Sequence, residues 1–183
     1  NLINEGIKEE KIFFVGNAMI DSLLKHKELA DKSDILEKSG LIRKKYCVLT
    51  LHRPSNVDNP ESFNKVVDII HEIQKKVKII FPIHPRTRNN IKSFGLTDAV
   101  SKMKNLILVE PLGYLDFLKL ISNAMFVLTD SGGIQEETTI LNVPCITLRD
   151  NTERHVTCEK GTNMLVSTKK EEIVNAVNTI LEN

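Results

Sequence analysis

Short apolar runs alternate along the chain with segments that have a helical pattern, and this alternation limits the folds open to it. The runs that read as strands are residues 12–15, 46–51, 77–83, 106–109, 125–129 and 144–148. They are apolar almost throughout, which is typical of strands covered on both faces in a parallel sheet. The pattern therefore predicts an α/β domain with a doubly wound, Rossmann-like parallel sheet.

Two of the intervening helices are indicated clearly. The first lies between residues 51 and 77, with Asn59 as a candidate N-cap and Pro60 at the first helical position. Its apolar residues recur at helical spacing: Phe63, Val66, Val67, Ile70 and Ile73. A similar stripe over residues 171–181 predicts that the chain closes with a helix packed on the domain.

Composition narrows the class of protein. A chain of 183 residues with 41% hydrophobic content can bury one full core. A net charge of +1 provides no broad field for nucleic acid or an anionic membrane, and no apolar run approaches the roughly 20 residues of a membrane helix. Cys47, Cys145 and Cys158 have no ligand-like spacing and are interpreted as reduced packing residues. We expect a soluble, cytoplasmic protein without a nucleic-acid or membrane partner.

The stretch Ser131-Gly132-Gly133 follows the apolar run 125–129 and leads directly into a helical pattern. A helix that starts there directs unpaired N–H groups and its positive dipole end at one point, which suits a phosphate. The glycines allow close approach, and the Ser131 hydroxyl can cap the helix or contact an oxygen. Glu137 falls about one turn into the helix, where its carboxylate can accept hydrogen bonds from a ribose diol.

Basic residues follow the neighbouring strands. His52 and Arg53 come after the run 46–51, His84 and Arg86 come after the run 77–83, and a charged loop over residues 149–155 follows the run 144–148. Parallel strands place these loops at one edge of the sheet, beside the Ser-Gly-Gly turn. Together they predict a ligand that contains a diphosphate.

Other chemistries lack the residues that they need. No grouping of His, Cys, Asp and Glu has metal-ligand spacing, and neither a Walker phosphate loop nor a Gly-x-Gly-x-x-Gly turn occurs. We therefore expect no metal and no bound cofactor. His26 and His71 lie in helical patterns and receive no role, and His155 remains a weak candidate.

Five ordered stretches, residues 15–21, 50–53, 84–87, 130–137 and 149–154, resemble the carboxyl-terminal half of the non-hydrolysing UDP-N-acetylglucosamine 2-epimerases. That family has a two-domain glycosyltransferase B type architecture. The resemblance implies that residues 1–183 are the UDP-binding carboxyl-terminal Rossmann-like domain and that the amino-terminal domain is absent from this chain. It also implies that the full-length protein is a homodimer.

The resemblance assigns roles residue by residue. Ser131, Gly132 and Gly133 would contact the diphosphate of UDP, and Glu137 would bind the ribose. The remaining assignments are the backbone of Phe117 at the base, Arg154 and the catalytic candidate His52 at the diphosphate, and His84 in a possible regulatory site for a second UDP-N-acetylglucosamine. Leu112 departs from the glutamine that relatives often carry.

The implied reaction interconverts UDP-N-acetylglucosamine and UDP-N-acetylmannosamine by elimination and re-addition of UDP, for cell-surface polysaccharide synthesis. Because the family's catalytic carboxylates lie in the other domain, we expect this chain alone to bind UDP without epimerising. Three alternatives stay open: a glycosyltransferase of the same architecture, a hydrolysing epimerase, and a non-catalytic nucleotide-sugar-binding module.

Overall fold

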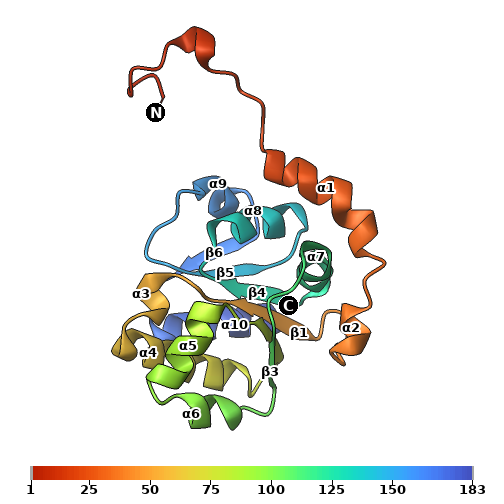
Figure 1. The fold of residues 1–183 in the computed structure, drawn as a ribbon, viewed down its shortest axis with the longest axis vertical. Helices are drawn as coiled ribbons and strands as arrows, with labels where there is room; N and C mark the ends of the chain where they lie inside the picture. Colours follow the sequence, from red (N-terminus) through yellow and green to blue (C-terminus); the bar gives the residue numbers. More distant parts are fainter. Residues whose placement is uncertain (1, 183) are drawn as a thin grey trace.

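A six-stranded parallel sheet crosses the computed structural model, which describes residues 2–182 (Figure 1). The strand order is β3-β2-β1-β4-β5-β6. The strands are β1 (Tyr46–Thr50), β2 (Lys78–Pro82), β3 (Leu106–Val109), β4 (Phe126–Thr129), β5 (Cys145–Leu148) and β6 (Asn163–Val166). The doubly wound α/β fold is confirmed, and five of the expected strand positions match β1 to β5.

Helices cover both faces of this sheet (Figure 1). The helical segments are η1 (Glu9–Lys11), α1 (Ala18–Ala30), α2 (Ile35–Lys38), α3 (Pro54–Val57), α4 (Pro60–Ile73), α5 (Pro85–Ser93), α6 (Thr97–Ser101), α7 (Tyr114–Asn123), α8 (Gly132–Ile140), α9 (His155–Glu159) and α10 (Lys170–Glu182). None of the helices within residues 2–182 combines the length and apolar character needed to span a membrane.

The two helices expected most clearly are confirmed. Helix α4 starts at Pro60, and the side chain of Asn59 caps it by accepting hydrogen bonds from the backbone N–H groups of Glu61 and Ser62. Its apolar face is buried against the sheet together with residues of α10. A second buried cluster lies on the opposite face, under α1, α2, α7 and α8.

The arrangement of strands fixes where a ligand can enter. Strand β1 pairs with β4, and the strand order runs in opposite directions on either side of this pair. The connections from these two strands therefore leave to opposite faces and open a crevice at their carboxyl ends. Thr50 and Thr129 mark those ends and are hydrogen-bonded through their hydroxyl groups at 2.6 Å.

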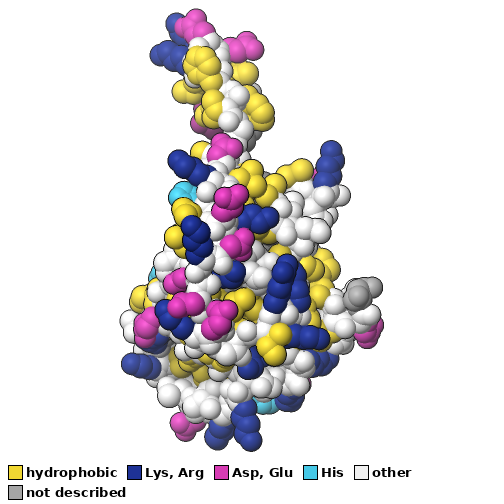
Figure 2. All heavy atoms as spheres, turned by 90° about the vertical axis from the view of Figure 1, so that its right-hand side faces the viewer, with side chains coloured by type: hydrophobic (Ala, Val, Ile, Leu, Met, Phe, Trp, Pro, Cys, Tyr) yellow, Lys and Arg dark blue, Asp and Glu magenta, His cyan; other side chains and the backbone are white. Residues whose placement is uncertain are grey.

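One expected strand is wrong, and one observed strand was not predicted. Residues 12–15 form no strand; they belong to an arm that precedes α1 and stands away from the body of the domain (Figures 1 and 2). Phe13 and Phe14 of the arm are 76% and 101% exposed, so their apolar character does not reflect burial within residues 2–182. Strand β6 was missed, because its short Asn-Met-Leu-Val segment is only partly buried at the edge of the sheet.

The cysteines agree with their interpretation as packing residues in two of three cases. Cys47 on β1 and Cys145 on β5 are buried and unpaired, and burial raises the pKa of the Cys145 thiol to about 11. Cys158 on α9 is also unpaired, but it is exposed and packs in neither core.

Candidate functional site

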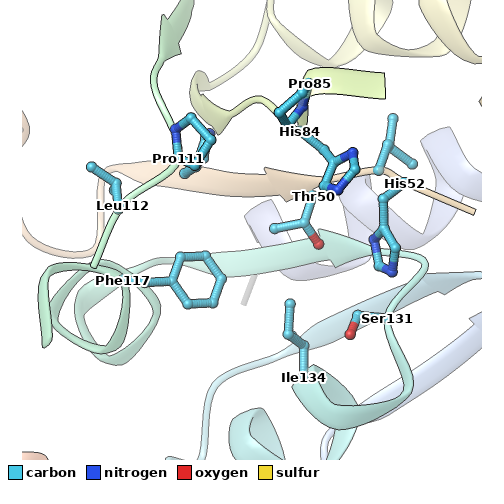
Figure 3. A pocket seen from close by; sticks show the side chains of 11 residues that line it. Thr50, His52, His84, Pro85, Pro111, Leu112, Phe117, Ser131 and Ile134 are labelled. Atoms are coloured by element: carbon cyan, nitrogen blue, oxygen red, sulfur yellow. The ribbon is translucent and has the colours of Figure 1, made fainter. Parts of the chain in front are cut away.

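A cavity of about 490 Å³ opens at the carboxyl ends of β1 and β4 (Figure 3). It is lined by Thr50, Leu51, His52, Pro82, His84, Pro85, Pro111, Leu112, Phe117, Ser131 and Ile134. The cavity thus brings together four residues that the sequence singled out: His52, His84, Phe117 and Ser131. The other two predicted side chains, Glu137 and Arg154, lie outside its lining.

Helix α8 begins at the edge of this cavity. Ser131 is its N-cap residue but makes no capping hydrogen bond with its side chain, so the first of the two roles expected for the hydroxyl is not adopted. A Cβ atom on Gly133 would stand 2.8 Å from Cε of Met19, and one on Gly132 would stand 2.8 Å from Oε1 of Glu153. Both atoms are the ends of flexible side chains, so a larger residue at either position would displace a neighbouring side chain from the start of α8.

A buried carboxylate, Asp130, organises the end of β1. It is fully buried and accepts hydrogen bonds from the backbone N–H groups of His52 and Arg53 and from the Asn56 amide. Its Oδ1 also lies 3.0 Å from Nδ1 of His52. Asp130 lies in the stretch 130–137, but no role was predicted for it; the apolar run before it was the signal that it is buried.

These contacts favour the protonated form of His52. The hydrogen bond with Asp130 raises the pKa of the imidazole above its ordinary value of 6.5 and outweighs desolvation, which lowers it. Burial alone would raise the pKa of Asp130, but the hydrogen bonds from His52 and Arg53 hold it below its usual range. Because 44% of the His52 side chain is exposed, a ligand at the cavity edge can reach this imidazole, whose protonated form Asp130 favours.

Glu137 lies on α8, about one turn from its start, and is buried. Burial raises the pKa of its carboxyl group, although the hydroxyl of Tyr114 acts in the opposite direction from 3.5 Å. Tyr114 begins α7 and was not predicted as a partner of this carboxylate. The contact between Tyr114 and Glu137 thus places the Glu137 carboxylate, a hydrogen-bond acceptor, between α7 and α8.

The side of the cavity across from His52 is apolar. Phe117 on α7 and Ile134 on α8 both reach into it, while His84 stands above Thr50 (Figure 3). His84 is the N-cap residue of α5, and its Nδ1 accepts a hydrogen bond from the backbone N–H of Arg86 at 3.2 Å. An apolar wall facing polar groups is the usual composition of a site for an organic ligand.

Arg154 lies in the loop after β5 and is held from two directions. Its Nε lies 3.2 Å from Oε2 of Glu136 as an ion pair without hydrogen-bond geometry, and Oε1 of Glu136 accepts from the Asn17 amide at 3.0 Å. Its backbone N–H donates to the Thr152 hydroxyl, which donates to buried Gln135. This polar network ties the loop to α8, and residue spacing carried no signal for it.

His155, a weak candidate in the sequence, is exposed at the start of α9 and lines none of the cavity. Within residues 2–182, no group of three or more His, Cys, Asp or Glu side chains is arranged to hold a metal ion.

Comparison with known proteins gives a consistent result. The family model described as UDP-N-acetylglucosamine 2-epimerase matches residues 1–183. The UDP-N-acetylglucosamine 2-epimerase of Methanocaldococcus jannaschii is 48% identical over 99% of this chain and 51% of its own length. A UDP-2,3-diacetamido-2,3-dideoxy-D-glucuronate 2-epimerase of Pseudomonas aeruginosa is 38% identical over 99% of this chain and 49% of its length.

Among solved structures, the M. jannaschii enzyme in complex with UDP-GlcNAc and UDP superposes with a TM-score of 0.90 at 47% identity. All of this chain and 51% of that one are covered. The chain thus spans about half the length of the curated relatives that it matches.

Proposed function

Because the chain belongs to the UDP-N-acetylglucosamine 2-epimerase family, we propose that it binds UDP and UDP-N-acetylglucosamine at the carboxyl ends of β1 and β4. One observation carries this proposal. Helix α8 starts at Ser131-Gly132-Gly133 without a side-chain cap, and this start lies at the same cavity edge as His52. Helix N–H groups and an imidazolium at one point favour a diphosphate.

The rest of the nucleotide has matching surroundings. We assign the ribose to the Glu137 carboxylate and the base to the apolar side of the cavity, near Phe117. Arg154 completes the charge around the diphosphate, which requires its guanidinium to turn from Glu136 toward the ligand.

The proposed reaction of the full-length protein is inversion at C2 of the sugar. The C2 proton is removed and the C1–O bond to UDP breaks, which gives a 2-acetamidoglucal; UDP then adds back while C2 receives a proton on the other face. A cation close to the leaving phosphate stabilises the charge that develops on it. His52 is suited to this role because Asp130 fixes its orientation and favours its protonated form.

The C2 proton requires a carboxylate that removes or donates it. We assign that group to the part of the relatives that this chain does not cover, and residues 1–183 to the carboxyl-terminal, UDP-binding domain of a glycosyltransferase B type protein. The full-length protein would act as a cytoplasmic homodimer that supplies UDP-N-acetylmannosamine for surface polysaccharides.

Calorimetric titration of the 183-residue chain tests the binding proposal. UDP should bind more tightly than ADP, and Glu137→Ala should weaken UDP more than pyrophosphate, because only UDP has a ribose. Arg154→Ala should reduce the free energy of UDP binding by about 1.5–3 kcal/mol, the range for a charge-assisted hydrogen bond. Lys65→Ala on the exposed face of α4 is the matched control.

Incubation with UDP-N-acetylglucosamine tests the reaction. The full-length protein should form UDP-N-acetylmannosamine, whereas residues 1–183 should bind without turnover. Free N-acetylmannosamine would identify a hydrolysing epimerase, and transfer of the sugar to an acceptor would identify a glycosyltransferase. The absence of UDP binding would refute the proposal.

A further inference from the structure

Arg149, the first residue after β5, has an incompletely paired side chain. Only 12% of the side chain is exposed, and its Nη2 donates to Oε2 of Glu153 at 2.9 Å. Its Nη1 is buried and has no hydrogen-bond partner within residues 2–182. A buried N–H group without an acceptor is unfavourable, so the position of this nitrogen calls for an additional acceptor.

The unpaired nitrogen lies beside the start of α8. A Cβ atom built on Gly132 would be 3.9 Å from Nη1 of Arg149. The same point is 2.8 Å from Oε1 of Glu153, so the glutamate carboxylate lies against the first residue of the helix. An anionic side chain therefore stands where the proposed function puts the diphosphate.

The carboxylate is charged and free to move. Its own backbone N–H, followed by Arg149, holds the pKa of Glu153 below its usual range, so it is an anion at neutral pH. Since 49% of the Glu153 side chain is exposed, it can turn into solvent without leaving a buried cavity. Helix starts stabilise anions, which accounts for the position of the Glu153 carboxylate.

We propose that Arg149 is a further diphosphate-binding residue and that Glu153 occupies the phosphate position until the nucleotide displaces it. A phosphate oxygen then replaces the Glu153 carboxylate as the partner of the Arg149 guanidinium, and a phosphate oxygen also accepts a hydrogen bond from Nη1. The planar guanidinium can hold two phosphate oxygens at once. This inference rests on the proposed function, since it concerns the same site.

Titrations with UDP, pyrophosphate and uridine test the role of Arg149. Arg149→Ala should lower the affinity for UDP and for pyrophosphate at least tenfold and leave uridine unchanged, because uridine has no phosphate. Arg149→Lys keeps the charge, so its affinity for UDP should lie between that of the unsubstituted chain and that of Arg149→Ala. A merely structural role would weaken uridine as well, and thermal unfolding of each variant identifies any that fail to fold.

Replacement of Glu153 should act in the opposite direction. Glu153→Gln removes a negative charge from the phosphate position and should tighten the binding of UDP and pyrophosphate about two- to tenfold. Glu61→Gln breaks another exposed i,i+4 ion pair, with Lys65 on α4, and should change neither affinity.

The outcomes separate the two proposals. Unchanged UDP affinity in both Arg149 variants, or weaker binding by Glu153→Gln, would overturn the present inference while the proposed function stands. If the unsubstituted chain binds neither UDP nor pyrophosphate, the proposed function falls and this inference falls with it.

Discussion

His52 and His84 follow neighbouring strands in similar sequence surroundings, yet the structure gives them different tasks. Their ring centroids are 6.1 Å apart at the same cavity. Nδ1 of His52 meets a buried carboxylate at 3.0 Å, whereas Nδ1 of His84 accepts a hydrogen bond from the Arg86 N–H. A carboxylate partner favours the protonated form of the His52 ring, whereas the partner of the His84 ring is the backbone of α5. The partner of each ring therefore determines whether it serves a ligand or caps a helix.

The carboxylate beneath His52 is expected to produce the largest effect when it is removed. Asp130→Ala leaves buried donors from His52, Arg53 and Asn56 without their acceptor. Loss of one partner from such a network costs about 3–5 kcal/mol in the free energy of unfolding. Urea denaturation measures it, with Asp68→Ala on the exposed face of α4 as control. A loss below about 1 kcal/mol would mean that solvent satisfies these donors.

The next largest expected effect is a difference in UDP affinity between variants of the two histidines. His52→Ala should weaken UDP by about 1.5–3 kcal/mol, because it removes a cation from the diphosphate. His84→Ala should change UDP affinity less than twofold, since its Nδ1 is engaged in capping α5. Calorimetry of both variants, with uridine as the ligand that lacks phosphate, provides the measurement. Equal losses in the two variants would remove the distinction between the rings.

The dependence of binding on pH sharpens the comparison. The hydrogen bond to Asp130 raises the pKa of His52 above 6.5. The imidazolium contribution to UDP affinity is therefore fully present at low pH and is lost as the pH rises through the raised value. The ratio of the affinities of the unsubstituted chain and His52→Ala isolates it, since ionisation of UDP itself cancels.

Asp130→Asn keeps the shape of the buried side chain but removes its charge. The fall in the affinity ratio should then move to lower pH, because the imidazolium has lost its carboxylate. His84→Ala should leave the profile where it is. A profile that does not move in Asp130→Asn would show that Asp130 does not control the ionisation of His52.

The sequence was sufficient for the parts of the fold that depend on regular patterns. Continuous apolar runs identified β1 to β5, and the Asn59-Pro60 pair located the start of α4. Residues 12–15 show the limit of this reasoning. An apolar run indicates side chains that are unfavourable in water. It does not indicate which partner, if any, covers those side chains. Phe13 and Phe14 meet no sheet in residues 2–182.

Much less of the site was visible in the sequence. Strand-end position and residue type grouped His52, His84 and Ser131, which line one cavity. Two of the partners that matter are distant in sequence: Asp130 is 78 residues from His52, and Asn17 is 119 residues from Glu136, the ion-pair partner of Arg154. Such pairs follow from the order of the strands and from packing, and no local spacing encodes them.

The smallest expected effect concerns the stability of α5. His84→Ala removes the side chain that caps the start of this helix, which costs about 1 kcal/mol in the free energy of unfolding. His84→Asn should retain most of that stability, because the asparagine oxygen can accept from the Arg86 N–H as the ring nitrogen does. Urea denaturation at pH 8 compares the two. If Asn destabilises as much as Ala, the ring holds α5 through packing, and the view of His84 as an acceptor fails.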